Sequence, residues 1–297
     1  MTYWLISNSK AGDGKRGRDF WLAALARAGI CDPECVDFSN LGWAKQIQPG
    51  DVLLVAGGDG SVNTGARLCL DNQATLAVLP SGTANDFARN LNLPEQPDPL
   101  CALIAEGKTQ KVDVAEYGQN LFLNVAHIGL GTLPVREAEP TEKKLFGRFS
   151  YGLQLLRKLN ARRGFKAEIR CGEGYASGRW LSIAIACGAF FGGGNEIPEA
   201  AANDGLLNVI AVKPRSIPQL LLAFLQVRFN RRVPKSTRTL VRLRGQTSTI
   251  HTSRHKTVTA DGDEAGTTPL TVNCRPGCLS VIGQTIIRTG RSADGNN

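Results

Sequence analysis

Two glycine-rich segments in the first third of the chain carry the residues best suited to hold a phosphate. They are Gly57-Gly58-Asp59-Gly60-Ser61-Val62-Asn63 and Pro80-Ser81-Gly82-Thr83-Ala84-Asn85-Asp86. Each follows an apolar run that predicts a buried strand, and each opens into a predicted helix, over 62–70 and over 84–91. A strand, a glycine turn and a helix in succession point backbone N–H groups and a helix N-terminus at an anion.

The composition of the two loops weighs against a simpler interpretation. Tight glycine turns are common at strand ends, and one such loop alone would support either interpretation. Glycines also remove the Cβ atoms that would hold a phosphate away from the main chain. The polar side chains suit a ribose, a phosphate or a magnesium-bound water, and they are Asp59, Asn63, Thr83, Asn85 and Asp86. The pair of loops therefore predicts one phosphate-bearing ligand.

Acidic residues outside the loops form a second group of candidates. Asp113 stands between two valines in a strand pattern, which is unusual for an acid without a partner or a metal ion. Asn203-Asp204-Gly205 and Asp261-Gly262-Asp263 have the composition of turns, and the residues alone favour that interpretation. Carboxylates are nevertheless the hard oxygen ligands that magnesium prefers, and a carboxylate near other acids can serve as a base.

The elements that would position the loops alternate between strand and helix over the first 113 residues. This alternation predicts a parallel sheet covered by helices on both faces. Ligands of such sheets bind beyond the carboxyl ends of the strands, where both glycine loops fall. The predicted strands cover 3–7, 35–38, 51–56 and 74–79, and the predicted helices cover 18–28, 62–70, 84–91 and 99–106.

From Lys111 onward, short β-like runs separated by glycines and prolines predict a β-sandwich. The runs cover 112–116, 121–126, 165–171, 179–187, 206–212, 239–243, 257–260, 270–274 and 278–282, and helices are predicted over 142–159 and 217–229. We therefore expect an α/β domain over 1–122 and a β-sandwich domain over 123–285. The tail over 286–297 is expected to return to the first domain.

Charge and hydropathy narrow the class of protein. The net charge is +9, and basic residues gather over 157–170 and 228–244, which favours an anionic partner or an ordinary solvated face. Neither cluster is interleaved with aromatic residues, so a stacking platform for nucleic acid is disfavoured. The longest apolar stretch, over 180–191, is shorter than the about 20 residues that cross a bilayer. We expect no transmembrane segment.

The cysteines and the start of the chain indicate a cytoplasmic protein. Several of the eight cysteines lie inside apolar strand or helix patterns, as reduced core cysteines do. Two pairs have three residues between them, but no further Cys or His follows at zinc-finger spacing. The N-terminus has no basic region and no cleavage site of a signal peptide.

With these motifs in order, the chain resembles the bacterial diacylglycerol/lipid kinase family, whose catalytic domain also occurs in sphingosine kinases and is related to NAD kinase. The resemblance extends over nearly the whole chain and rests on several separate motifs. They are Asn8-Ser9-Lys10-Ala11-Gly12, the two glycine loops, the segment with Asn124, Gly129 and Gly131, the turn Asn203-Asp204-Gly205-Leu206-Leu207, and Asp261-Gly262-Asp263. Their order and spacing make the resemblance specific.

The resemblance implies a nucleotide site on the first domain. Ser39 matches the family's threonine near the end of the second strand, although the loop after it is shorter here. The residues that would bind the nucleotide are Asn8, Ser9, Lys10, Ala11, Gly12, Ser39, Gly57, Gly58, Asp59, Gly60, Ser61, Val62, Asn63, Thr64 and Thr83.

The resemblance also implies a magnesium site and a catalytic acid. Asp204 would bind the ion through its side chain and Ala201 and Leu206 through their carbonyls, with Asp86 and Asp113 linking the ion to the nucleotide. The family's Asp-Gly-Glu signature reads Asp261-Gly262-Asp263-Glu264 here. Counting to Pro269 puts Asp263 in the catalytic position, whereas a shift of one residue favours Glu264. The asparagine that often precedes the segment 190–194 is absent.

What the resemblance implies as function is an ATP-dependent, magnesium-dependent lipid kinase acting on diacylglycerol or a related glycerolipid. The β-sandwich domain would bind the lipid. A small-molecule kinase of the NAD kinase type and a non-catalytic basic binding protein are the alternatives. The expected partners are a lipid at an anionic membrane surface and a second copy of the chain in a homodimer, and nucleic acid is not expected. The apolar segment 216–232, which ends in arginines, is a candidate for membrane docking or for packing on the β-domain.

Overall fold

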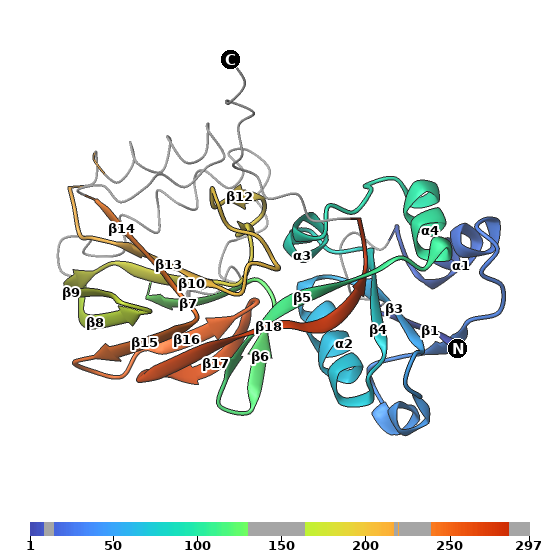
Figure 1. Ribbon diagram of the computed structural model, residues 1–297, viewed down its shortest axis with the longest axis horizontal. Coiled ribbons are helices and arrows are strands. Elements are labelled where there is room, and N and C mark those ends of the chain that lie inside the picture. Colours follow the sequence, from blue (N-terminus) through green and yellow to red (C-terminus); the bar gives the residue numbers. More distant parts are fainter. Residues whose placement is uncertain (9–14, 130–163, 217–218, 220–238, 285–297) are drawn as a thin grey trace, which may run out of the picture.

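The computed structural model describes residues 1–8, 15–129, 164–216, 219 and 239–284. An α/β part at the N-terminal end stands beside a part built of two antiparallel sheets (Figure 1). The predicted helices over 142–159 and 217–229, the docking segment 216–232 and the tail over 286–297 lie almost wholly outside the described residues. No helix among the described residues is long and apolar enough to cross a bilayer.

The first part is the parallel sheet that the strand and helix alternation predicts. Its strands lie in the order β2-β1-β3-β4 and all run parallel. The strands are β1 (Tyr3–Ser7), β2 (Glu34–Val36), β3 (Val52–Gly57) and β4 (Thr75–Pro80). The helices are α1 (Arg18–Arg27), the 3-10 helix η1 (Leu41–Gln46), α2 (Asp59–Asn72), α3 (Asp86–Asn90) and α4 (Pro97–Glu106).

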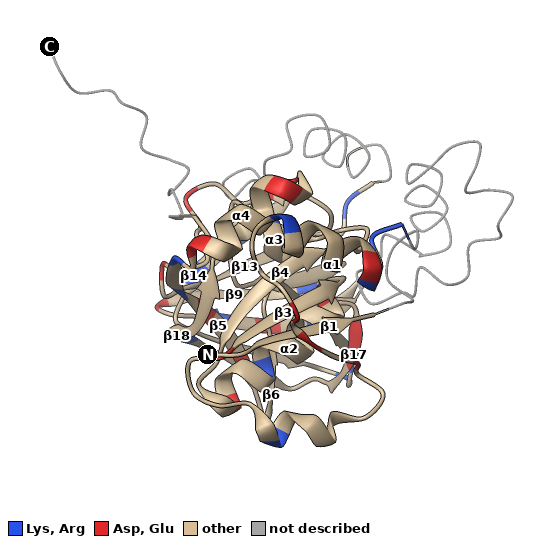
Figure 2. Ribbon diagram, turned by 90° about the vertical axis from the view of Figure 1, so that its right-hand side faces the viewer, with Lys and Arg blue, Asp and Glu red and all other residues tan. Residues whose placement is uncertain are grey.

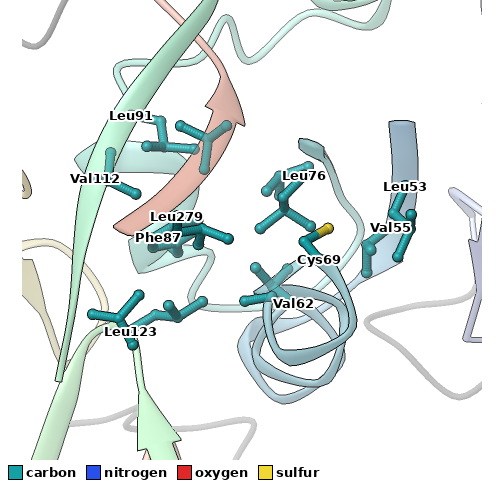
Figure 3. Close-up of a cluster of buried hydrophobic side chains, with 14 of the residues drawn as sticks. Leu53, Val55, Val62, Cys69, Leu76, Phe87, Leu91, Val112, Leu123 and Leu279 are labelled. Atoms are coloured by element: carbon teal, nitrogen blue, oxygen red, sulfur yellow. The ribbon is translucent and has the colours of Figure 1, made fainter. Parts of the chain in front are cut away.

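Two hydrophobic clusters cover the two faces of this sheet. On one face, apolar residues of α2 pack on β3 and β4, as Figure 3 shows for Val62 and Cys69 between Leu76 and Val55, and Phe87 of α3 lies beside Leu279 in the same cluster. On the other face, α1 and α4 bury Trp21, Leu25 and Leu100 against the alternate residues of the same strands. The sheet is therefore buried on both faces, and its ligand-binding positions lie at the strand ends.

The second part is a pair of antiparallel sheets that enclose a third cluster of buried residues. One sheet has the order β14-β13-β10-β7-β16-β17, and the other contributes β18, β15, β8 and β9. The strands of the first are β7 (Val125–Gly129), β10 (Ser182–Ala186), β13 (Leu207–Val212), β14 (Leu240–Gly245), β16 (Thr257–Ala260) and β17 (Asp263–Thr267). Those of the second are β8 (Phe165–Cys171), β9 (Gly174–Trp180), β15 (Thr247–Thr252) and β18 (Leu270–Ile282), and the predicted β-sandwich is confirmed.

Two long strands join the parts. β5 (Thr109–Tyr117) pairs antiparallel with β18 and with the short β6 (Asn120–Phe122). β18 starts beside β15 in the second part and ends beside β4 in the first, where Val281 pairs with Leu76. The segment 279–282 therefore lies at the edge of the first sheet, beside β4.

Several predicted elements differ from the structure. The run 179–187 is two strands, β9 and β10, which lie in opposite sheets, because the chain crosses from one sheet to the other near Leu181. The run 121–126 likewise divides between β6 and β7, whereas the runs 270–274 and 278–282 form the single strand β18 with an irregular register between Arg275 and Leu279. β15 and the two-residue strands β11 (Phe190–Phe191) and β12 (Asn195–Glu196) were not predicted.

Candidate active site at the junction of the two parts

The two glycine loops lie side by side at the carboxyl ends of β3 and β4. These strands are neighbours, and their last residues Gly57 and Pro80 are paired. A Cβ on Gly82 would lie only 2.5 Å from the Cα of Gly58, so the loops touch backbone to backbone. The prediction that both loops converge on one place is therefore consistent with the geometry.

The first loop is shorter than predicted because α2 begins at Asp59 and not at Val62. Gly58 precedes the helix with an extended backbone and no side-chain cap, and the first helical bond in this turn is donated by the N–H of Val62 to the carbonyl of Gly58. The N–H groups of Asp59, Gly60 and Ser61 have no acceptor within the helix, as is general for a first helical turn. They form the positive end of the helix dipole and can donate to an anion.

Close packing fixes the shape of the first loop. A Cβ on Gly57 would lie 2.5 Å from the Cβ of Ser61, so no other residue fits there without movement. Asn8 follows β1, donates its backbone N–H to the carbonyl of Ala56, and donates its side-chain Nδ2 to Ser61 Oγ at 3.0 Å. Asn8 thus stabilises the position of the first loop. The four residues predicted beside it, Ser9, Lys10, Ala11 and Gly12, lie outside the described residues.

The second loop is held by its own asparagine and by α1. The side chain of Asn85 accepts from the N–H of Gly82 at 3.1 Å and donates to the carbonyl of the same residue at 2.8 Å. Trp21 on α1 donates Nε1–H to Ser81 Oγ at 2.9 Å. Thr83 remains exposed between these anchors, where its hydroxyl is accessible to a ligand.

Some residues that were predicted to bind the nucleotide also have partners within the protein. Asn63 donates its Nδ2 to the carbonyl of Leu121 and to Asp261 Oδ2, both at 3.1 Å. Thr64 donates its hydroxyl to the carbonyl of Gly60, and Val62 is buried in the core. The side chains of these three residues help to hold α2 in position.

Asp59 and Ser39 also have partners within the protein. Asp59 Oδ1 accepts from the N–H of Phe87 at 3.3 Å and from Asn124 Nδ2 at 3.2 Å, and burial raises the pKa of this carboxyl. Ser39 donates its backbone N–H and its hydroxyl to Asp37, and it follows β2 at the sheet edge where the loops lie. Two strands separate β2 from β4, so Ser39 stands at the outer end of this edge.

The turn Asp261-Gly262 is anchored at the junction by one carboxylate. Asp261 Oδ1 accepts from the N–H groups of Asn124 and Val125, both at 3.0 Å, and Oδ2 accepts from the N–H of Leu123 at 2.8 Å and from Asn63. Burial raises the pKa of the Asp261 carboxyl. Asp261 thereby ties the hairpin of β16 and β17 to the chain between β6 and β7 and to helix α2. The hairpin itself is the one the Asp-Gly sequence predicts.

Asp263 is the carboxylate that this turn presents to the glycine loop. A Cβ on Gly60 would lie 3.5 Å from Asp263 Oδ2, so the side chain stands directly beside the first turn of α2. Asp263 pairs with Ala260, whose side chain lies in the core, while Glu264 pairs with Thr259. Successive side chains of a strand point to opposite faces, so Glu264 is directed away from Asp263. The geometry favours Asp263 over Glu264.

Asp86 and Asp113 act as acceptors for backbone N–H groups. Asp86 accepts from the N–H groups of Gly193 and Gly194, both at 2.8 Å, and forms an ion pair with Arg89 at 3.2 Å. Both carboxylates are almost fully buried. Each therefore fixes a loop of the second part to an element of the first.

Asp113 lies on β5 and joins two turns. It accepts from the N–H of Gly205 at 2.6 Å and from the N–H of Gly277 at 2.8 Å. Burial raises the pKa of the Asp113 carboxyl. The sequence expectation that this buried acid must have a partner is therefore met by backbone donors.

Asp204 holds the turn over 201–206 and forms an ion pair with Arg244. Its carboxylate accepts from the N–H groups of Ala201 at 2.8 Å and Leu206 at 2.9 Å. Arg244 on β14 donates to Asp204 Oδ2 at 2.7 Å, and the Asp204 side chain is only 3 % exposed. A buried carboxylate with a guanidinium beside it is arranged to hold positive charge. No group of three or more His, Cys, Asp or Glu residues that could hold a metal ion occurs in the described part of the chain.

Two further polar residues at the junction were not predicted as site residues. Asn90 of α3 accepts with Oδ1 from the N–H groups of Ala189 at 2.8 Å and Phe190 at 2.9 Å. Asn124 joins Asp59 to Asp261 as described above. The sequence contains a signal for Asn90, since it is a polar residue at a buried position of a helix, but only the fold shows its partners.

Comparison with known proteins finds two family models that match this chain. Residues 127–283 match the model of the YegS C-terminal NAD kinase beta sandwich-like domain, and residues 2–117 match that of the diacylglycerol kinase catalytic domain. A protein of Yersinia enterocolitica named probable lipid kinase YegS-like is 32% identical over 195 residues, which are 63% of this chain and 66% of that protein. A protein of Yersinia pestis with the same name is 33% identical over 60% of this chain and 61% of its own length. The chain thus spans less than two thirds of the length of these relatives.

Solved structures resemble almost the entire chain. A putative diacylglycerol kinase from Bacillus anthracis superposes with a TM-score of 0.77 at 24% identity, covering 96% of both chains. A second structure titled as a putative diacylglycerol kinase from the same organism gives 0.76 at 25% identity and covers 96% of this chain and 98% of the other. With both domain models in their expected order, the chain belongs to the family that joins a diacylglycerol kinase catalytic domain to a YegS-type C-terminal β-sandwich domain.

Proposed function

We propose that the protein is an ATP-dependent lipid kinase that transfers the γ-phosphoryl group to a hydroxyl of diacylglycerol or a related glycerolipid. One observation carries the proposal: Asp263, a candidate base, stands beside Gly60 in the glycine loop whose N–H groups are available to a phosphate. Relatives with the same two domains are named as probable lipid kinases, which supports the choice of acceptor.

The glycine loops would hold the phosphates through the main chain. The N–H groups of Asp59, Gly60 and Ser61 converge at the start of α2, and Thr83 adds a hydroxyl from the second loop. Phosphoryl transfer requires positioning and charge stabilisation more than covalent chemistry, so preformed N–H donors are an effective contribution. Because the loops touch at Gly58 and Gly82, they would bind the nucleotide as one surface.

Asp263 would act as the general base for the acceptor. It accepts the proton of the lipid hydroxyl while the hydroxyl oxygen forms a bond to the γ-phosphorus, and the bond from the γ-phosphorus to the bridging oxygen breaks to release ADP. A positioned base of this kind contributes about 10²–10⁴-fold in rate. Asp263 is exposed in the free protein, so its carboxylate is accessible to the acceptor.

Magnesium fits the donor types of the predicted metal residues. Asp204 offers a carboxylate that already pairs with the guanidinium of Arg244. Ala201 and Leu206 donate their N–H groups to this carboxylate, and their carbonyls are the hard oxygen donors that the resemblance assigns to the ion. Asp113 would support this turn through the N–H of Gly205, and Asp86 would hold the separate segment with Gly193 and Gly194; neither would be a ligand of the ion. A bound Mg²⁺ would neutralise charge there, and it would have to share Asp204 with Arg244.

The proposal is tested with γ-labelled ATP, Mg²⁺ and separate acceptors in detergent micelles. The acceptors are diacylglycerol, phosphatidylglycerol, ceramide, a sphingoid base and NAD. We expect label in a glycerolipid, with kcat reduced by about 10²-fold or more in Asp263→Asn and little changed in Glu264→Gln. Label in NAD alone, or in no acceptor, would contradict a lipid kinase. Loss of activity in Glu264→Gln with full activity in Asp263→Asn would move the base by one residue.

The same proposal includes a cytoplasmic enzyme that meets its lipid at a membrane surface. A homodimer stays a prediction, which sedimentation of the purified chain would test.

A further inference from the structure

A concave surface on the outer face of β8, β9 and β15 lies outside the site described above. It encloses about 710 Å³ and is lined mainly by polar and basic side chains. Its lining includes Lys166 and Arg170 of β8, Arg179 of β9 and His251 of β15. We call this surface, together with the adjoining Tyr175 of β9, the basic sheet face. Lys166 and Arg170 belong to the first basic cluster of the sequence, to which the proposed phosphoryl transfer gives no role.

Strand alternation puts these side chains on one face. Ala167, Ile169 and Cys171 of β8 point into the hydrophobic core of the second part, so Lys166 and Arg170 point to the opposite side. The pairing of β8 with β9 places Arg179 opposite Lys166 and Tyr175 opposite Arg170. The basic groups are therefore fixed by rigid strands and do not depend on a flexible loop.

Lys166 and Arg179 bring two positive charges to directly opposite positions, and Arg179 also donates to the carbonyl of Gly164 at 3.4 Å. Directly opposite residues of an antiparallel pair have close Cβ atoms, and like charges there destabilise the sheet. The acid within the lining is Glu168, which pairs with Ser177 and His251. Within the described part of the chain neither Lys166 nor Arg170 forms an ion pair, so the face has an excess of positive charge. An anion at this surface would be attracted by this excess of positive charge.

Tyr175 gives the face an amphipathic group. It is 54% exposed, one of the few exposed large hydrophobic side chains among the described residues, and the guanidinium of Arg170 lies 5.3 Å from its ring centroid. A tyrosine has an apolar ring and a polar tip, which suits the boundary between water and lipid. Lysine and arginine beside it would contact phosphate groups at the same depth.

We infer that the basic sheet face docks on the phosphate headgroups of an anionic phospholipid membrane. The inference rests on the proposed function, because a lipid kinase must meet its acceptor at a membrane. The breadth and openness of the surface, which extends over three strands, fit an array of headgroups better than a single small anion. Charge complementarity and the exposed Tyr175 are the observations that select this occupant.

The test measures sedimentation of the whole chain with vesicles of phosphatidylcholine alone or mixed with phosphatidylglycerol. We expect binding to the mixed vesicles only, and a loss of at least about thirtyfold in affinity for the variant K166E/R179E. The control K108E/K111E makes the same change of net charge at two exposed lysines near the α/β part and should bind nearly as well as the unchanged protein. Figure 2 shows basic and acidic residues intermixed at that end of the molecule. Equal binding by K166E/R179E and the unchanged protein would overturn the inference.

Further experiments distinguish membrane docking from the proposed kinase activity and from nucleic-acid binding. Phosphorylation of a short-chain diacylglycerol dispersed in detergent should be unaffected in K166E/R179E, since no docking is needed there. If the unchanged protein phosphorylates no lipid but binds anionic vesicles through this face, the proposed function fails and the docking surface stands. Binding of duplex DNA as tightly as vesicles, lost in the same variant, would replace the membrane by nucleic acid. K166Q/R179Q should unfold no more easily than the unchanged protein while binding vesicles more weakly, which a purely structural role would not produce.

Discussion

The glycine loops and the acidic turns meet at the same junction but differ in what their polar groups contact. In the loops, the N–H groups of Asp59, Gly60 and Ser61 have no helical acceptor, and Thr83 is exposed. In the acidic turns, the carboxylates of Asp113 and Asp204 already accept two backbone N–H groups each, and Asp261 accepts three, before any ligand arrives.

This difference separates residues that bind a ligand from residues that place others. A group whose hydrogen bonds are complete within the protein contributes to the relative position of the two parts. A group without a partner is available for a substrate. Its position before the substrate binds depends on the groups whose hydrogen bonds are complete. Asp263 belongs with the loops, because it is exposed beside Gly60, although it lies two residues from the fully bonded Asp261.

The largest effect is expected for Asp261→Ala. The substitution would leave the N–H groups of Leu123, Asn124 and Val125 without their acceptor, and we expect the free energy of unfolding to fall by about 3–5 kcal/mol. Urea denaturation measures it. The matched control Asp263→Ala removes an exposed carboxylate two residues away and should change stability by less than about 0.5 kcal/mol. Equal loss in both variants would remove the distinction between the two acids.

A pH effect of about 3 kcal/mol is expected from His127, a group on β7 whose Nδ1 has no partner among the described residues. Burial lowers the pKa of His127 to about 4 from its ordinary 6.5. The unfolded chain therefore binds this proton more tightly, so stability present above pH 6.5 is lost as the pH falls toward 4. Thermal melting of the unchanged protein and of His127→Leu across this range should show a shallower pH dependence in the variant. Parallel curves would contradict the assignment.

The nucleotide loop should respond in affinity and not in stability. Gly60→Val would place a side chain where the loop backbone must approach a phosphate, and we expect ATP affinity to fall by about a hundredfold in calorimetry. The free energy of unfolding should be nearly unchanged, because a Cβ at this position meets only Asp263 Oδ2 at 3.5 Å. Unchanged ATP affinity in this variant would place the nucleotide elsewhere.

The smallest effect is expected for the stabilisation of the protein by Mg²⁺ when Asp204 loses its partner Arg244. In Arg244→Gln the carboxylate loses its guanidinium partner, so Mg²⁺ should stabilise the variant by about 1 kcal/mol more than it stabilises the unchanged protein. Melting with and without MgCl₂ measures the difference. The double variant Asp204→Asn with Arg244→Gln should lose this extra stabilisation, and its persistence would show that the ion binds at another place.

The sequence predicted the architecture well because its signals are local. Buried apolar runs, glycine turns and alternating patterns define β3, β4 and their loops directly. The partners of the acids could not be predicted, since Asp86 and Gly193, or Asp113 and Gly277, are brought together only by the packing of distant strands. Arg244 was included in a basic cluster by its charge, and its partner Asp204 depends on the pairing of β13 with β14. For the same reason Asn63 and Thr64, predicted from the loop motif, prove to bond within the protein.

Amide hydrogen exchange with and without Mg²⁺–ATP tests the contrast most directly. In the free protein the amides of Asp59, Gly60 and Ser61 should exchange rapidly, whereas those of Gly193, Gly194, Gly205 and Gly277 should be protected by their bonds to Asp86 and Asp113. The nucleotide should then protect the loop amides and leave the other four unchanged. Protection that arises on nucleotide binding at the four glycines, with none at the loop, would contradict the account.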